Sequence, residues 1–180
     1  MNYKHIILTR FNLQYDLQSN IHIQDSWLEE RFRLFEQYCF PSIIAQTNQQ
    51  FDWVILVSDQ TPKNYLSRLA KHTNSHLNIY IELCTYYEDV NVLYNNIGEK
   101  YVHGYDYLLS TRVDNDDMLA KDFVETLQKL LPATYASAVL TFTNGIQWFE
   151  HKDMAFAVAY DRNHFLSFWE EKQNIRTSLG

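Results

Sequence analysis

Short apolar runs alternate with amphipathic helical segments along the first two thirds of the chain, and this alternation most constrains its fold. The clearest run, residues 51–57 (FDWVILV), is almost continuously apolar and has the length of a strand, which is typical of strands covered on both faces of a parallel sheet. We expect three further strands, at residues 5–9, 77–83 and 105–113. The alternation predicts an α/β fold, with an open, mostly parallel, twisted sheet and helices on both faces.

Helices are expected between and after these strands. Ser26 and Glu29 form a capping box, and apolar residues then recur at helical spacing until Pro41 interrupts the helix. The other expected helices are a continuation over 42–46, one that begins at Pro62, and segments 91–103 and 119–131. Beyond Pro132 the pattern predicts β-structure at 138–142, 146–149 and 155–160, followed by a last helix over 164–172.

Composition excludes several functional classes. The net charge is −7, and the 15 Lys and Arg residues form no block, so nucleic acid is not an expected partner. The chain has four glycines, and they are not spaced as in a dinucleotide-binding fingerprint or a P-loop. Cys39 and Cys84 are expected to be buried thiols without a disulfide, as in a reducing compartment. No apolar stretch approaches the length of about 18 residues that a membrane span needs, so we expect a cytoplasmic protein with no membrane span or signal peptide.

Three carboxylates, Asp114, Asp116 and Asp117, directly follow the expected strand at 105–113. Ligands of open α/β sheets bind beyond the carboxyl ends of the strands. Because like charges packed this closely repel one another, a divalent cation is a natural way to offset the repulsion. Oxygen ligands without nearby His or Cys suit Mg²⁺ or Mn²⁺.

Other interpretations of this cluster remain open. Asp117 could cap the following helix while its neighbours are solvated. The Asp-x-Asp pattern also occurs in phosphatases that form an aspartyl-phosphate, although there it normally opens the domain. An EF-hand loop does not fit, because Met118 and Leu119 stand where a ligand and a glycine are required.

Several ordered segments resemble the large inverting nucleotide-sugar glycosyltransferase family with the GT-A fold. Residues 42–47 (SIIAQT) and 51–59 (FDWVILVSD) are similar to its S-I-x-x-Q-T … E-I-I-I-V-D-D segment. Residues 96–98 and 104–117 are similar to its N-x-G … G-x-Y-I … D-x-D-D segment. The segments 9–12 (TRFN), 27–29 (WLE) and 111–117 (TRVDNDD) resemble the rhamnosyltransferase subgroup, and the resemblance covers roughly residues 6–131.

The resemblance implies a GT-A (nucleotide-diphospho-sugar transferase) fold over a single glycosyltransferase-like domain, 1–180. Residues 1–131 would be the nucleotide-sugar-binding half, and 132–180 a mixed β acceptor-side region that is shorter than usual in the family. The implied function is metal-dependent transfer of a sugar, with rhamnose as one candidate, from a nucleotide-diphosphate donor to a hydroxyl of a glycan or other acceptor. The alternative is a catalytically incompetent module that only binds the nucleotide sugar.

The resemblance also implies roles for individual residues. By this resemblance, the donor would be bound by Thr9, Arg10, Asp59, Asn96, Arg112 and Asp114. The metal ion, Mg²⁺ or Mn²⁺, would be held by Asp114, Asp116 and Asp117. Two of these roles have alternatives, because Arg112 could instead pair with Asp114, and Asn96 could serve the backbone of its helix.

The catalytic base is expected downstream of the carboxylate cluster. The family often places it in an acidic pair on a short helix, which only Glu170 and Glu171 resemble, although a solvated helix face explains them equally well. Glu150 is a rival, because neighbouring aromatic residues could stack a sugar. His72 and His76 have a spacing that can chelate a metal on a helix, but no third ligand is near, and we expect two exposed histidines.

Overall fold

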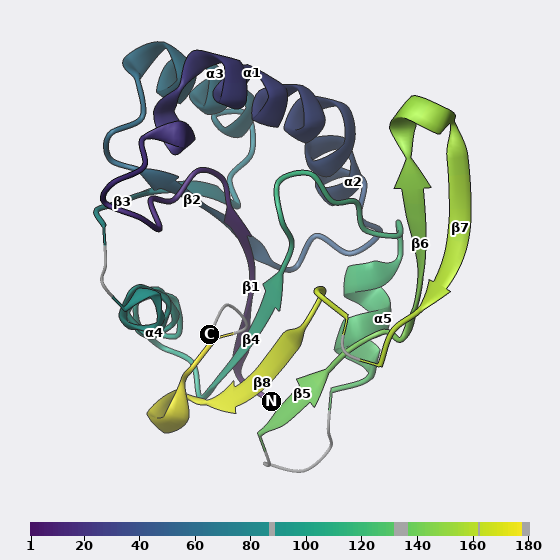
Figure 1. Cartoon of the computed structure of the whole chain (residues 1–180). Helices are drawn as coiled ribbons and strands as arrows, with labels where there is room; N and C mark the ends of the chain where they lie inside the picture. The colour runs from purple at the N-terminus through teal and green to yellow at the C-terminus, as the bar shows by residue number, and fades with distance from the viewer. Residues whose placement is uncertain (87–88, 132–136, 162, 178–180) are drawn as a thin grey trace.

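The computed structural model of the chain describes residues 1–86, 89–131, 137–161 and 163–177. Its centre is a six-stranded sheet with the order β3-β2-β1-β4-β8-β5 (Figure 1). Strands β1 (Tyr3–Arg10), β2 (Asp52–Ser58), β3 (Ile79–Cys84) and β4 (Tyr107–Arg112) are parallel. Strand β8 (Ser167–Glu171) runs antiparallel to β4, and β5 (Ala138–Leu140) antiparallel to β8. The predicted α/β fold with an open, mostly parallel sheet is therefore confirmed.

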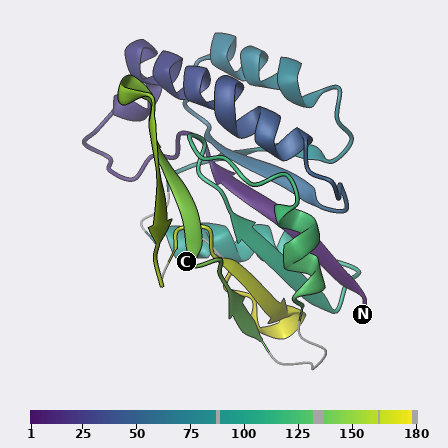
Figure 2. The ribbon, with the colours of Figure 1, turned by 90° about the vertical axis from the view of Figure 1, so that its right-hand side faces the viewer.

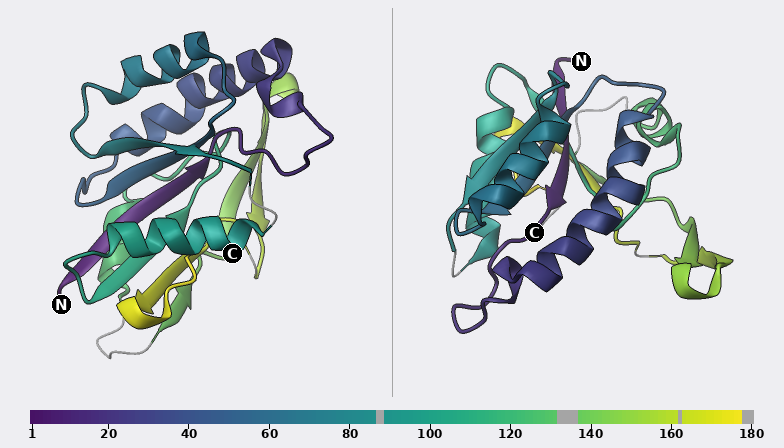
Figure 3. Two further views of the ribbon diagram at one scale, coloured as in Figure 1. Left: turned by 90° about the vertical axis from the view of Figure 1, so that its left-hand side faces the viewer. Right: turned by 90° about the horizontal axis from the view of Figure 1, so that it is seen from above.

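Helices cover both faces of this sheet (Figures 1 and 3). The helices with regular α geometry are α1 (Asp25–Leu34), α2 (Phe40–Ile44), α3 (Lys63–Thr73), α4 (Val90–Tyr101) and α5 (Phe123–Lys129). Side chains of α1, α3 and α5 share one hydrophobic core with Ile7 and Ile55, whereas α4 shares a second core with Ile6 and Leu8. Consecutive residues of a strand point to opposite faces, so an apolar run such as Ile6–Ile7–Leu8 serves both cores.

The helix that begins at Asp25 continues past the predicted break at Pro41. A π-helical turn, η2 (Phe35–Cys39), links α1 to α2, and the N–H of Phe40 donates to the carbonyl of Phe35. Proline cannot donate a backbone hydrogen bond, and a wider turn just before Pro41 lets the helical path proceed without a sharp kink. Three short 3₁₀ turns complete the helical elements of the described residues: η1 (Ile21–Ile23), η3 (Glu150–Lys152) and η4 (Lys172–Asn174).

The helix predicted over residues 164–172 is wrong, because its centre is strand β8. Ser167 pairs with Thr111 and Glu171 with Tyr107 across the antiparallel ladder to β4. The fully buried ring of Trp169 stacks on Tyr107, with ring centroids 4.8 Å apart and planes 4° from parallel. This long-range packing outweighs the local helical pattern, as is common for short aromatic segments.

A separate hairpin, β6 (Asn144–Phe149) and β7 (Met154–Ala159), stands beside the main sheet (Figure 2). Together with β5 and β8 it confirms that the chain becomes β-rich beyond Pro132. Cys39 and Cys84 are buried and free, as predicted. In the described part of the chain, no helix is both long and apolar enough to cross a membrane.

Candidate functional site

A pocket of about 450 Å³ opens beyond the carboxyl ends of the neighbouring parallel strands β1 and β4. This volume lies within the range of small-molecule sites. Three segments line the pocket: the loop after β1, helix α1 and the loop after β4. The lining residues are Arg10, Phe11, Asn12, Leu13, Tyr15, Asp16, Ser19, Ile21, His22, Trp27, Arg31, Asp114, Asn115 and Asp116.

Asp114 is bound by two arginines from adjacent strand ends. Nη2 of Arg10 lies 3.0 and 3.1 Å from the two carboxylate oxygens, and Nε lies 3.2 Å from Oδ1. Nη2 of Arg112 lies 2.7 Å from Oδ2. All three side chains are partly buried, with about a quarter of each exposed. Of the two predicted roles for Arg112, pairing with Asp114 is therefore the contact seen in the structure.

Asp116 pairs with a residue that the sequence analysis did not single out. Nη1 of Arg31, on α1, lies 2.7 Å from Oδ2 of Asp116. The guanidinium also stacks over the Trp27 ring, 5.2 Å from its centroid. In the sequence, only the resemblance of segment 27–29 to the rhamnosyltransferase subgroup drew attention to this part of α1. Because residues four apart on a helix lie on the same face, Arg31 could have been inferred to lie beside Trp27.

The loop after β4 gathers its acidic residues in a tight turn, in which the N–H of Asp117 donates to the carbonyl of Asp114. The pKa of Asp117 is raised to about 7, first by burial and then by the charges of Asp116 and Asp114. The side chain of Asn115 donates to the carbonyl of Phe11 and ties this loop to the one after β1. The alternative in which Asp117 caps the next helix is wrong, because α5 begins only at Phe123.

The chemistry of this acidic loop fits a hard divalent cation with few protein ligands. The described residues include no group of three or more His, Cys, Asp or Glu side chains placed to form a complete protein cage. Magnesium, however, is commonly held by one or two carboxylates together with substrate phosphates. Asp114 and Asp116 both line the pocket, and their negative charges add to the burial that raises the pKa of Asp117. These two carboxylates are the residues that could hold such an ion.

The structure does not bring Thr9, Asp59 and Asn96 to the lining of this pocket. Thr9 is fully buried and its hydroxyl accepts a hydrogen bond from Nε1 of Trp53 at 2.9 Å. Asp59 is exposed at the end of β2, and its N–H donates to the carbonyl of Cys84. Asn96 is exposed in the middle of α4, away from the helix N-terminus that would serve a phosphate.

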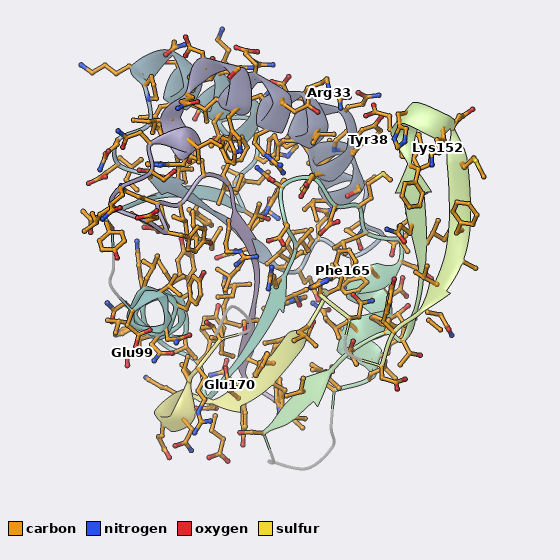
Figure 4. The ribbon with its side chains drawn as sticks, in the orientation of Figure 1. Arg33, Tyr38, Glu99, Lys152, Phe165 and Glu170 are labelled. Carbon is orange, nitrogen blue, oxygen red and sulfur yellow. The ribbon has the colours of Figure 1, made fainter. Side chains whose placement is uncertain are left out.

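Glu170 and Glu171 lie on β8 opposite the amino-terminal half of β4, and therefore away from the pocket. Glu170 is buried, and its carboxylate accepts hydrogen bonds from the backbone N–H groups of Arg176 and Thr177 at 2.8 and 2.9 Å. Figure 4 shows Glu170 at the opposite end of the sheet from the helix that carries Arg33 and Tyr38. The expected acidic pair on a short helix is thus a pair on a strand, and Glu170 holds the C-terminal segment.

Glu150 lies at the tip of the β6–β7 hairpin. Its two carboxylate oxygens accept from Nη1 and Nη2 of Arg33 at 2.7 Å each, and the hydroxyl of Tyr38 donates to Oε1 at 2.7 Å. Trp148 packs edge-on against Tyr38. These contacts attach the hairpin tip to the α1–η2 helix (Figure 4), and Glu150 does not line the pocket.

His72 and His76 are packed rather than exposed. Nε2 of His72 lies 2.8 Å from Oε1 of Glu36, and both imidazole rings pack against Phe40. Within the described residues they belong to no group that could hold a metal.

Residues 5–170 match a family model described as "Putative rhamnosyl transferase". No curated protein matches the chain. Because the family model covers most of the chain, the chain belongs to this rhamnosyl transferase family, and a sugar donor and acceptor follow from that membership.

Proposed function

We propose that this member of the rhamnosyl transferase family moves a sugar from a nucleotide-diphosphate donor to an acceptor hydroxyl, on a fold of GT-A type and with a divalent metal ion. The observation that carries the proposal is the pocket beyond β1 and β4, where Arg10, Arg31, Asp114 and Asp116 meet. Open α/β sheets bind ligands at this position. Rhamnose is the transferred sugar that the family description suggests.

Arginine side chains suit the diphosphate part of such a donor. A guanidinium group presents planar, forked N–H donors that match phosphate oxygens. Arg10 and Arg31 both line the pocket, and Arg112 holds the same carboxylate as Arg10. Apolar and aromatic side chains in the lining, including Tyr15, Ile21 and Trp27, provide accessible surface against which the nucleoside can pack.

Asp114 and Asp116 are the proposed metal ligands, with Asp117 beside them. A bound Mg²⁺ or Mn²⁺ would act as a Lewis acid for the charge that develops on the departing nucleoside diphosphate. The bond between the anomeric carbon and the diphosphate oxygen breaks as the acceptor oxygen bonds to that carbon. A base must take the proton of the acceptor hydroxyl.

A second candidate is a module that binds nucleotide sugars without transferring them. One observation favours it: none of the predicted bases, Glu150, Glu170 and Glu171, lines the pocket. Both candidates bind the nucleotide-sugar donor, but only the transferase transfers the sugar and releases the nucleoside diphosphate.

One experiment separates these candidates. UDP-, dTDP- and GDP-linked sugars, including a rhamnose donor, are incubated with the protein with and without Mn²⁺, in the presence of hydroxyl acceptors. Metal-dependent release of the nucleoside diphosphate, lost in Asp116→Asn and retained in Asp122→Asn, supports the transferase. Nucleotide binding by calorimetry without any release supports the binding module, and neither binding nor release contradicts both. Asp122 is a suitable control because it is exposed and its side chain does not cap α5.

A further inference from the structure

Arg31 has more hydrogen-bond donors than the described residues use. A guanidinium group has five N–H donors and no acceptor. Nη1 of Arg31 binds one oxygen of Asp116, while its Nε is buried without a hydrogen-bond partner among the described residues. The side chain is partly buried, stacks on Trp27 and lines the pocket.

The neighbouring arginines use their donors more fully. Arg33, two positions along α1, binds the carboxylates of Glu30 and Glu150 through four hydrogen bonds. Arg10 makes three hydrogen bonds to Asp114. Arg31 is thus a cation at the pocket with unused donors, and within the described residues its ion-pair partner is one carboxylate oxygen of Asp116.

Asp116 lies between two cations if the proposed metal site is correct. Its carboxylate binds Arg31 in the unliganded structure and would bind the divalent ion in the liganded one. A divalent ion at Asp116 weakens the attraction between that carboxylate and Arg31, so the guanidinium becomes available to another anion. The nearest new anion would be the diphosphate of a donor held in the same pocket.

We propose that Arg31 is a diphosphate-binding residue, which holds Asp116 while the pocket is empty and transfers to a donor phosphate when the cation occupies Asp116. This inference rests on the proposed function. Metal binding and donor binding then strengthen each other. The metal ion at Asp116 releases Arg31 for the diphosphate, and a bound diphosphate keeps Arg31 from competing with the metal ion for Asp116. Arg31 therefore opposes metal binding when no nucleotide is present.

If Arg31 has these two roles, Arg31→Gln should change the affinities for Mn²⁺ and for the nucleotide in opposite directions. Without nucleotide, Mn²⁺ no longer competes with a guanidinium for Asp116, so its affinity should rise severalfold. With Mn²⁺ present, the variant lacks a charge-assisted hydrogen bond to the diphosphate. Its affinity for UDP, dTDP or GDP, whichever the parent protein binds, should therefore fall about tenfold or more. Affinity for the matching nucleoside should stay the same. Arg31→Lys should fall between the parent protein and Arg31→Gln, because a lysine keeps the charge but not the fork.

Calorimetry of the full chain with Mn²⁺ alone, and with each nucleotide in excess Mn²⁺, measures these affinities. Arg33→Gln is the matched control on the same helix and should leave both affinities unchanged. If the parent protein binds no nucleoside diphosphate, the proposed function fails and this inference fails with it. If the parent binds but Arg31→Gln binds the nucleotide equally well, only the Arg31 role is overturned. Loss of both Mn²⁺ and nucleotide binding in Arg31→Gln also overturns it, because that pattern indicates a structural role.

Discussion

Arg10 and Asp114 lie 104 positions apart in the sequence, yet Nη2 of Arg10 is 3.0 and 3.1 Å from the two oxygens of the Asp114 carboxylate. Arg10 is the last residue of β1, and Asp114 follows β4, its parallel neighbour in the sheet. The ion pair therefore joins the carboxyl ends of two central strands at the point where the pocket opens. Arg112 reinforces it from the same side of the sheet.

Asp114→Asn should lower both stability and ligand affinity. Removing this carboxylate leaves the guanidinium groups of Arg10 and Arg112 close together and partly buried without their shared anion. We expect the free energy of unfolding to fall by about 1–3 kcal/mol, the range for a buried hydrogen-bonding group that is left without its partner. Urea denaturation at pH 7 measures this change. Asp122→Asn is the control and should remain within about 0.5 kcal/mol of the parent; an equal effect of the two substitutions would contradict the role of the ion pair.

Glu150→Gln should loosen the hairpin tip. The carboxylate is held by Arg33 and then by Tyr38, and these hydrogen bonds lower the pKa of Glu150 to about 2. An uncharged amide cannot replace the two-pronged ion pair. We expect faster amide hydrogen exchange in residues 144–159, measured by mass spectrometry, with the exchange of the central sheet unchanged.

Glu30→Gln is the matched control for this prediction, because Glu30 is the other acidic partner of Arg33 but makes no hairpin contact in the ion-pair network. It should leave exchange in the hairpin unchanged. The transfer assay adds a second readout, since loss of a general base costs about 10²–10⁴-fold in rate. A loss of that size with unchanged hairpin exchange would assign Glu150 to catalysis instead of anchoring.

Local sequence patterns were sufficient to predict the four parallel strands and the residues that end two of them. The position of Asp114 followed from the strand that precedes it, because ligands of open α/β sheets bind beyond the carboxyl ends of the strands. Arg10 was placed beside it only by the resemblance to the glycosyltransferase family, and the parallel pairing of β1 with β4 brings the two together. Arg31 could not be placed there, because its contact with Asp116 depends on how α1 packs over the sheet.

Strand β8 shows the same limit. The segment around Trp169 has both helical and extended character, and only its pairing with β4 decides between them. That pairing also moves Glu170 from an expected helix surface to the buried end of a strand. The helix predicted over residues 164–172 and the overlooked contact between Arg31 and Asp116 both depend on contacts between segments far apart in the sequence.

His5 should make the protein lose stability in mild acid. The imidazole is buried, Nδ1 accepts a hydrogen bond from Nε2 of Gln128, and Nε2 donates to the hydroxyl of Thr111, each at 3.0 Å. Burial lowers the pKa of His5 to about 3. Because the unfolded chain takes up this proton near pH 6.5 and the folded chain does not, stability present above pH 6.5 is lost as the pH falls toward 3. We expect His5 to contribute about 2 kcal/mol to the loss between pH 7 and pH 5.

Urea denaturation of the parent and of His5→Asn at both pH values tests this expectation. The substitution should destabilise the protein at pH 7 but reduce the further loss at pH 5. His103→Asn, at an exposed position, is the control and should keep the parent's pH dependence. An unchanged pH dependence in His5→Asn would show that other groups cause the acid sensitivity.

Gly98→Ala should destabilise the chain even though alanine favours helices more than glycine does, by about 1 kcal/mol. Gly98 lies in α4, and an added Cβ would be 2.5 Å from Cγ2 of both Ile175 and Thr177. These short β-branched side chains cannot turn away without moving the C-terminal segment, so we expect a net loss of about 1–3 kcal/mol in the free energy of unfolding. Gly145→Ala is the control, because its nearest neighbour, a methyl group of Val158, would be 3.8 Å away. Urea denaturation of both variants measures this change. If Gly98→Ala were more stable than the parent, the C-terminal segment with Ile175 and Thr177 would not be packed against α4. The glycine of the 96–98 motif would then be needed for something other than close packing.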